Sequence, residues 1–327
     1  MTYDVVGIGN AVADVIANAP DTFLAHMGIE KGIMQLIDRD RAELLYAAME
    51  GRVETPGGSV ANSIAGLGAL GLACGFAGKV ADDALGHFYA DAMEQGGTRF
   101  LGTPQPATLP TSRSMIFVSP DGERSMNTYL GISAEIGPDD VDEEVLKGAE
   151  ILFLEGYLFD KDKGKAAFEA AAAATGGAGG RCGITLSDPF CVERHREDFQ
   201  ELISGPMNFV IGNEHEWVAL YETDLDTALD RAAELCEIVV CTRGGEAVTI
   251  ARRGDFVDVP VERRDVVDAT GAGDQFAAGF LYGLSTGRDM RTCGRMGVVA
   301  AAEVIGHVGP RPETDMRALF AAKGLAG

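Results

Sequence analysis

Short apolar runs alternate with helical stretches along most of this 327-residue chain, and that alternation constrains the fold more than any single motif does. The stretches at 82–95, 163–174, 194–203 and 227–235 predict helices. Strand–helix–strand units fold into a mostly parallel sheet with helices on both faces. We therefore expect an α/β fold with a doubly wound sheet. The predicted buried strands are 3–8, 74–80, 151–158, 183–186, 209–211 and 238–241.

A predicted β-hairpin interrupts the alternation. Residues 114–119 and 124–130 flank a Pro-Asp-Gly turn, which is typical of a hairpin connection. A second strand-like segment, at about 12–38, follows the first strand. We expect one domain over residues 1–327, with a small sheet inserted from about 12–38 and 99–130. Such a sheet would cover an active site as a lid, and ordinary edge hairpins are the alternative.

The charge balance argues against polyanionic partners. The chain has 27 basic and 50 acidic residues, a net charge of −23, which repels nucleic-acid backbones and anionic lipid surfaces. We find neither a signal peptide nor the roughly 18 to 20 consecutive apolar residues that span a bilayer. The six cysteines are scattered, without a CxxC pair, which is typical of reduced thiols. We therefore expect a cytoplasmic protein that binds neither nucleic acid nor membranes.

The segment Asp268-Ala-Thr-Gly-Ala-Gly-Asp274 carries the strongest chemical signal. The apolar residues after it recur four apart, so a helix is expected to begin at the glycine cluster. Gly271 and Gly273 allow main-chain N–H groups to approach a ligand closely, and a helix N-terminus attracts anions. Asp274 is suited to take a proton from an attacking hydroxyl while the amides hold phosphoryl charge. The alternative is an Asp that only stabilises the first helical turn.

A second glycine-rich segment starts at Gly57-Gly58-Ser59 and continues through Asn62 into a helix of small residues. Two glycines before such a helix allow backbone and polar side chains to close around a compact polar ligand. Ser59 could also belong to a nucleophile elbow, but residue 61 is Ala where that motif has Gly. No obvious Asp and His partners follow nearby, so we give the hydrolase reading little weight.

In their order and separation, these two segments resemble the two signatures of the ribokinase-like (PfkB) family of sugar and nucleoside kinases. Asn213-Glu-His-Glu216 resembles the family's Asn-x-x-Glu motif near the metal and phosphates, and Thr242-Arg-Gly244-Gly resembles its nucleotide-binding turn. The resemblance covers essentially the whole chain and implies a ribokinase-like α/β fold with a small β-sheet lid. Ala269 departs from the Thr, Ser, Pro or Val that is usual there, which weakens a local hydroxyl contact.

Within that family the chain is most similar to adenosine kinase-like members. The similarity rests on Gly9-Asn10 with Asp14, on the segment 31–35, on Arg124-Ser-Met, on Gly212-Asn-Glu and on the Gly-Pro-Arg tail at 309–311. It implies that Asp14 binds the vicinal hydroxyls of a ribose and that Arg124 clamps a phosphate. The alternatives are a simple surface acid and a solvated hairpin charge.

The resemblance also implies a set of site residues. The catalytic group is Asp274 with the amides of Gly271, Ala272 and Gly273. The substrate-binding residues are Asn10, Asp14, Gly57, Gly58, Ser59, Asn62 and Arg124. The ATP-binding residues are Asn213, Glu216, Thr242, Gly244, Gly271 and Gly273, with Mg²⁺ held through water by Asn213 and Glu216. The resemblance further implies activation by a monovalent cation such as K⁺, which would involve the loop before Asp268 and the region near residues 300–309.

The expected reaction is ATP-dependent phosphorylation of the 5′-hydroxyl of a ribonucleoside, with adenosine converted to AMP as the first candidate. A kinase for a free sugar such as ribose or fructose is the nearest alternative, and a non-catalytic nucleoside sensor is another. A nucleobase needs an apolar slot. Met34, Phe117, Met126 and Tyr129 could line such a slot or form the core of the lid. The sequence leaves open whether the protein is a monomer or a homodimer.

Overall fold

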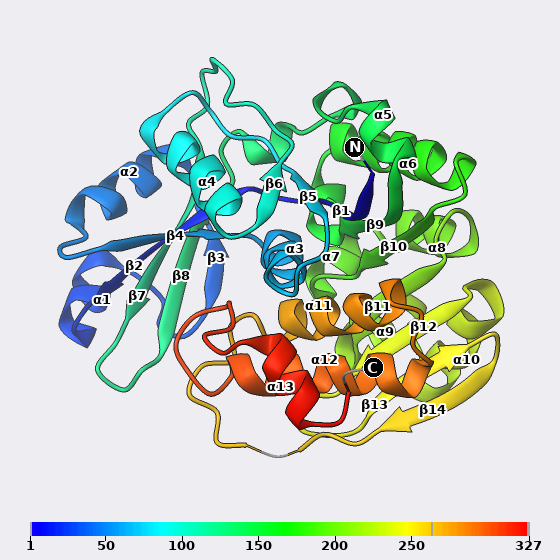
Figure 1. Cartoon of the computed structure of the whole chain (residues 1–327). Helices are drawn as coiled ribbons and strands as arrows, with labels where there is room; N and C mark the ends of the chain where they lie inside the picture. The colour runs from blue at the N-terminus through cyan, green and yellow to red at the C-terminus, as the bar shows by residue number, and fades with distance from the viewer. Residues whose placement is uncertain (1, 263, 326–327) are drawn as a thin grey trace.

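The computed structural model describes residues 2–262 and 264–325 and contains a large and a small β-sheet (Figure 1). Within these residues, the large sheet has nine strands in the order β14-β13-β12-β11-β10-β9-β1-β5-β6. In this order, the neighbouring strands from β12 across the sheet to β6 pair in parallel. At the other edge, β13 pairs antiparallel with both β12 and β14. They are β1 (Tyr3–Ile8), β5 (Cys74–Ala77), β6 (Thr98–Phe100), β9 (Ala149–Glu155), β10 (Arg181–Thr185), β11 (Phe209–Asn213), β12 (Ile238–Thr242), β13 (Val248–Arg252) and β14 (Asp255–Val259). The predicted α/β fold is confirmed.

Helices cover both faces of the large sheet because successive strand residues point to opposite faces. Val5 of β1 packs in one apolar core with α3 (Ser59–Ala69), α4 (Ala84–Gln95), α11 (Ala272–Ser285) and α12 (Met290–Val304). Its neighbour Val6 packs in the other core. The helices of that second face are α5 (Glu143–Lys147), α6 (Asp162–Gly177), α7 (Pro189–Arg194), α8 (Arg196–Ser204), α9 (Glu214–Tyr221) and α10 (Leu225–Leu235). The short helix α13 (Met316–Ala322) packs on α12 near the C-terminus.

The small sheet lies at the left of Figure 1, with its strands in the order β3-β8-β7-β2-β4. They are β2 (Val12–Asn18), β3 (Met34–Leu36), β4 (Val53–Gly57), β7 (Ser112–Val118) and β8 (Arg124–Tyr129). Helices α1 (Asp21–Met27) and α2 (Arg39–Ala48) cover one face, where Val15, Met115 and Phe117 form a core with them. The predicted hairpin is confirmed as β7 and β8.

The structure differs from the sequence-based expectations at several boundaries. The small sheet includes β4, which lies outside the predicted ranges. This strand was not predicted because its sequence, Val-Glu-Thr-Pro-Gly, lacks the apolar pattern of a strand. Residues 99–100 belong instead to β6 of the large sheet. The helix predicted at 194–203 is divided at His195 into α7 and α8. The antiparallel strands β13 and β14 were not predicted, and β14 is mostly exposed, as an edge strand can be.

The six cysteines are free and buried in the structure. Among the helices that the structure describes, none has the length and apolar character needed to cross a membrane.

Candidate active site

The glycine cluster forms the N-terminus of α11, as its pattern predicts. Gly271 is the N-cap with φ of 79°, a left-handed conformation that favours glycine. A Cβ at Gly271 would lie 2.6 Å from Cα of Pro310, whereas a Cβ at Gly273 would meet no atom within 4 Å. The chain packing therefore requires glycine at position 271, while Gly273 borders open space at the start of the helix.

This difference predicts opposite outcomes for two matched substitutions. Gly271→Ala should lower the free energy of unfolding by about 1 to 3 kcal/mol, because the backbone is strained and Pro310 must move. Gly273→Ala should leave it unchanged or raise it by up to about 1 kcal/mol, since alanine favours a helix more than glycine does. Urea unfolding of both variants measures the difference. Equal losses of stability would show that the packing against Pro310 is not what requires glycine.

Two side chains of α3 hold the carboxylate of Asp274. Ser59 Oγ donates to Oδ1 at 2.7 Å, and Asn62 Nδ2 donates to Oδ2 at 3.1 Å. Burial raises the pKa of Asp274 to about 6, although both hydrogen bonds act to lower it. The two glycine-rich segments, more than 200 residues apart, therefore meet at one carboxylate, and Ser59 serves as its hydrogen-bond donor rather than as a nucleophile.

Asp14 of β2 lies near Asp274 and against Gly57 at the end of β4. A Cβ at Gly57 would collide with the Asp14 carboxylate, so glycine is what lets the carboxylate sit there. Burial raises the pKa of Asp14 to about 7, the charges of Arg311 and Arg124 lower it, and the charge of Asp274 raises it. The predicted diol-binding and catalytic carboxylates are thus close enough to influence each other.

Asn10 and Gly58 hold the adjoining backbone together. Asn10 donates from its N and Nδ2 to Glu155 Oε1 at 3.2 and 2.8 Å, and Ser133 Oγ donates to Asn10 Oδ1 at 2.9 Å. Val60 N donates to Glu155 Oε2 at 3.1 Å. Gly58 has φ of 103°, and a Cβ there would collide with the carbonyl oxygen of Asn10. The side-chain atoms of Asn10 are therefore engaged within the protein, where they fix the start of α3.

Glu155, at the end of β9, was not indicated by the sequence. It is buried, and burial raises its pKa to about 7 despite three hydrogen bonds that lower it. Its partners lie 145 and 95 residues away along the chain, so no local pattern could have identified it. The only sequence signal was an acidic residue inside the buried strand predicted at 151–158.

Arg124 joins the small sheet to the loop before α11. Its Nη2 lies 2.9 Å from Oδ2 of Asp268, and the two side chains are only 9% and 8% exposed. Asp268 also accepts hydrogen bonds from N and Oγ1 of Thr270 and from Gly309 N. Arg124 is therefore not a solvated hairpin charge. Both oxygens of Asp268 therefore have positively polarised partners within the protein.

A cavity of about 160 Å³ brings several predicted residues together beside Asp274. Ser59, Asn213, Glu216, Thr242 and Gly273 line it. Because its wall includes the N-terminus of α11 together with side chains of α3, β11, α9 and β12, it is suited to a group of phosphate size and charge.

Asn213 and Glu216 form a capping box at the start of α9. Asn213 Oδ1 accepts from Glu216 N at 3.0 Å, while Glu216 accepts from N and Nδ2 of Asn213 at 2.8 and 2.7 Å. Burial raises the pKa of Glu216 to about 7. These oxygen donors suit Mg²⁺, which keeps most of its waters. No cluster of three acidic, His or Cys side chains that could hold a metal occurs in residues 2–262 and 264–325, so a magnesium ion would also need ligands from phosphates.

A larger cavity, of about 500 Å³, adjoins the first and shares Thr242 and Gly273 with it. Gly244, at the predicted nucleotide-binding turn, lies in its wall. Its apolar lining is formed by Val248, Val261, Val266, Ala269, Ala272, Phe276, Val298, Ala301, Ala302 and Ile305. An apolar cavity that opens onto an anion-binding helix N-terminus fits a nucleotide, with the base in the large part and the phosphates in the small part.

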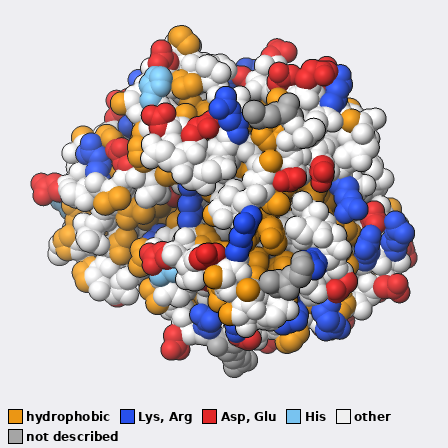
Figure 2. Space-filling view, viewed as in Figure 1, with side chains coloured by type: hydrophobic (Ala, Val, Ile, Leu, Met, Phe, Trp, Pro, Cys, Tyr) orange, Lys and Arg blue, Asp and Glu red, His pale blue; other side chains and the backbone are white. Residues whose placement is uncertain are grey.

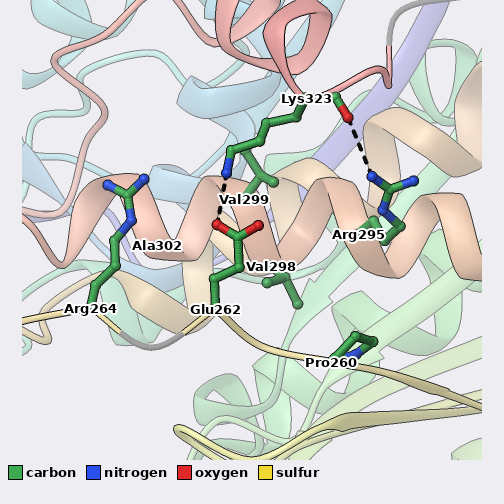
Figure 3. A pocket seen from close by; sticks show the side chains of 8 residues that line it. All are labelled: Pro260, Glu262, Arg264, Arg295, Val298, Val299, Ala302 and Lys323. Atoms are coloured by element: carbon green, nitrogen blue, oxygen red, sulfur yellow. Dashed lines mark hydrogen bonds and ion pairs between the residues drawn. The ribbon is translucent and has the colours of Figure 1, made fainter.

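Figure 3 shows a third cavity, of about 50 Å³, outside the nucleotide-sized one. Lys323 Nζ lies 2.7 Å from Glu262 Oε2, and Arg295 Nη2 donates to the carbonyl oxygen of Lys323 at 3.3 Å. Its wall shares Glu262, Arg264, Val298 and Ala302 with the nucleotide-sized cavity. A space of this volume holds a few waters at most. We therefore regard this cavity as part of the outer wall of the larger one.

Comparison with known proteins gives a consistent assignment. Residues 32–316 match the sequence profile described as the pfkB family of carbohydrate kinases. The structure aligns at a TM-score of 0.91 with a probable sugar kinase from Rhizobium etli CFN 42, which is 42% identical over 99% of this chain and 100% of that chain. It aligns at 0.90 with the adenosine kinase from Sinorhizobium meliloti, which is 44% identical over the whole of both chains. Adenosine kinase from Saccharomyces cerevisiae (strain ATCC 204508 / S288c) is 24% identical over 348 residues, 95% of this chain and 97% of that one.

By its sequence and its ribokinase-like fold, the chain belongs to the pfkB family of carbohydrate kinases, phosphotransferases that use ATP and an alcohol acceptor.

Proposed function

We propose that this kinase transfers the γ-phosphoryl group of ATP to the 5′-hydroxyl of a ribonucleoside, with adenosine as the expected acceptor. The observation that carries this proposal is an apolar row on the face of the small sheet that also bears Asp14. The adenosine kinases among the similar proteins support the choice of acceptor.

The apolar row crosses all five strands of the small sheet. Met34 pairs with Met126, Met126 with Ile116, Ile116 with Ile16, and Ile16 with Val53. Directly paired residues point to the same face of a sheet. Met34 and Val53 are 46% and 61% exposed, and Figure 2 shows hydrophobic side chains gathered over this part of the molecule.

Asp14 lies two residues from Ile16 on the same strand, and therefore on the same face. Its neighbours in the adjoining row are Thr55, Ser114 and Thr128. A polar row with a carboxylate beside an apolar row matches a ribose joined to a base, whereas a free sugar needs polar groups on every side. Phe117, by contrast, packs in the core on the opposite face.

Tyr129 also packs against the core beneath α1 and α2. Of the four side chains considered for a base-binding slot, Met34 and Met126 therefore lie on the face of Asp14, and Phe117 and Tyr129 belong to the core of the small sheet.

In the proposed reaction, Asp274 accepts the proton of the 5′-hydroxyl as that oxygen attacks the γ-phosphorus. The N–H groups at Gly271, Ala272 and Gly273 stabilise the charge on the transferring group. Asp14 accepts hydrogen bonds from the two ribose hydroxyls and orients the 5′ carbon. Mg²⁺, when bound, neutralises phosphate charge near Asn213 and Glu216. The small sheet, held down by the Arg124–Asp268 ion pair, excludes water from the acceptor side.

A free-sugar kinase is the second candidate, favoured by the probable sugar kinase that is 42% identical to this chain. An ATP-consumption assay with adenosine, inosine, guanosine, ribose and fructose separates the two. We expect adenosine to give the highest kcat/KM. Higher kcat/KM with ribose or fructose would overturn the nucleoside assignment, and no stimulation by any acceptor would favour a non-catalytic sensor.

A variant of the apolar row sharpens this assay. Met126→Gln should raise the KM for adenosine by about tenfold or more, because a base would then meet a polar side chain. It should leave the KM for ATP within about twofold. Leu44→Gln is the matched control, since Leu44 is 55% exposed on α2, which covers the opposite face of the small sheet.

A further inference from the structure

The segment Gly309-Pro310-Arg311 is fastened onto the loop and helix that carry Asp274. Gly309 N donates to Asp268 Oδ2 at 2.8 Å, and Pro310 O accepts from Gln275 Nε2 at 3.0 Å. Gln275 is the residue after Asp274, and its Nε2 also donates to the carbonyl oxygen of Asn62 at 3.1 Å. The segment is therefore bound on both sides, and the position of Arg311 is fixed relative to α3 and α11.

Arg311 acts on the Asp274 carboxylate through Asn62. Arg311 Nε donates to Asn62 Oδ1 at 3.4 Å, and Asn62 Nδ2 donates to Asp274 Oδ2 at 3.1 Å. An asparagine amide has one accepting and one donating end, so a cation at Oδ1 orients Nδ2 toward the carboxylate. Without the guanidinium, the amide could rotate and present its oxygen to Asp274. The Arg311 side chain is further held by a contact from Nη2 to Met93 Sδ at 3.4 Å.

The charge of Arg311 is shared between two carboxylates. It forms no ion pair with any acidic side chain that the structure describes, yet it lowers the pKa of both Asp14 and Asp274. The other titratable groups that face these residues are Tyr89 of α4, Arg124 of β8, Glu155 of β9 and Tyr157, which follows β9. Burial lowers the pKa of Arg311 itself. A buried cation placed between two acids offsets the repulsion that would otherwise favour protonation of one of them.

We propose that Arg311 is a positioning residue of the phosphoryl-transfer site, which orients Asn62 against Asp274 and compensates the charges of Asp14 and Asp274. This inference rests on the proposed role of Asp274 as the base. It gives a function to the Gly-Pro-Arg tail, for which the sequence supplied a resemblance but no role.

Two substitutions separate the charge from the hydrogen bond. Arg311→Met removes both. The acid limb, the fall of kcat/KM at low pH, should therefore have its midpoint about 1 pH unit higher, and kcat at pH 7 should fall at least about tenfold. Arg311→Lys keeps the charge but loses the planar donor, so the limb should stay within about 0.3 units while kcat falls severalfold. Added guanidinium ion should restore part of the activity of Arg311→Ala.

Arg317→Met is the matched control, since Arg317 lies six residues further along, is exposed and donates to the carbonyl oxygen of Leu70. It should change neither the acid limb nor kcat by more than about twofold. An unshifted limb in Arg311→Met, with kcat within twofold of wild type, would overturn the proposal. All measurements use whichever acceptor gives the best rate. Failure of the base assignment would instead appear as an active Asp274→Asn enzyme, so the two outcomes are distinguishable.

Discussion

Asp274→Asn should lower kcat by about 10²- to 10⁴-fold, which is the usual effect of removing a general base. The substitution keeps the shape of the side chain, and Ser59 Oγ can still donate to its oxygen atom. ATP affinity should therefore remain nearly unchanged, because no protein contact to the nucleotide-sized cavity is removed. Initial rates and an equilibrium titration with ATP measure the two quantities separately.

Asp289→Asn is a suitable control, because Asp289 caps α12 by accepting from Thr292 N, and asparagine caps a helix about as well as aspartate. It should leave kcat unchanged. If Asp274→Asn retained activity within about threefold of wild type, the general-base assignment would be wrong.

The pH dependence provides a second measurement of the same group. A general base must be deprotonated, so activity should fall as the pH drops through the pKa of Asp274, which is about 6. Asp14, with a pKa of about 7, must also be ionised to bind a diol strongly. The acid limb of kcat/KM should therefore lie between about pH 6 and 7, with a plateau above it. In Asp274→Asn the contribution of Asp274 should disappear, leaving only that of Asp14.

Asp14→Ala should raise the KM for the nucleoside by about 10²-fold or more and leave the KM for ATP within about twofold. The carboxylate would accept two hydrogen bonds from adjacent hydroxyls, and hydrogen bonds to a charged group contribute about 1.5 to 3 kcal/mol each. Steady-state kinetics with each substrate varied in turn measures both constants. Equal effects on the two KM values would contradict the diol role.

2′-Deoxyadenosine makes this measurement specific for the diol. The wild-type enzyme should discriminate against it, because one hydroxyl donor is missing and part of the Asp14 carboxylate is left unpaired. In Asp14→Ala the difference between adenosine and 2′-deoxyadenosine should largely disappear. Discrimination that persists in the variant would place the contact with the 2′-hydroxyl on another residue.

The sequence was sufficient wherever the determining interactions are local. The start of α11 at Gly271 depends on the conformation of one glycine and on the apolar spacing that follows it, and both are visible in a short segment. The β7–β8 hairpin is likewise determined by its turn residues and the flanking strands. In both cases the prediction and the structure agree within a few residues.

Long-range contacts determine the parts that the sequence did not reveal. Arg311 and Asn62 are 249 residues apart, and Asn10 and Glu155 are 145 apart, so their pairing exists only in the folded chain. The Asn213–Glu216 box illustrates a different difficulty. From the sequence we related its spacing only to a metal-associated motif, whereas the structure shows that the same residues cap a helix. β4 escaped prediction because its register with β2, rather than its own apolar pattern, makes it a strand.

The two sheets are joined by four passages of the chain, and these passages touch one another. Gly58 lies against the carbonyl oxygen of Asn10, Ser133 Oγ donates to Asn10 Oδ1 at 2.9 Å, and Ile132 N donates to Pro110 O at 3.0 Å. Any movement of the small sheet away from the large one must bend all four passages together, so we expect it to be a rotation about the place where they touch. We therefore expect these contacts to serve as a hinge, and Asn10 and Gly58 belong to them, close to the carboxylates of the acceptor site. A single joint of this kind would let the enzyme admit and release an acceptor without disturbing the strand pairing of either sheet.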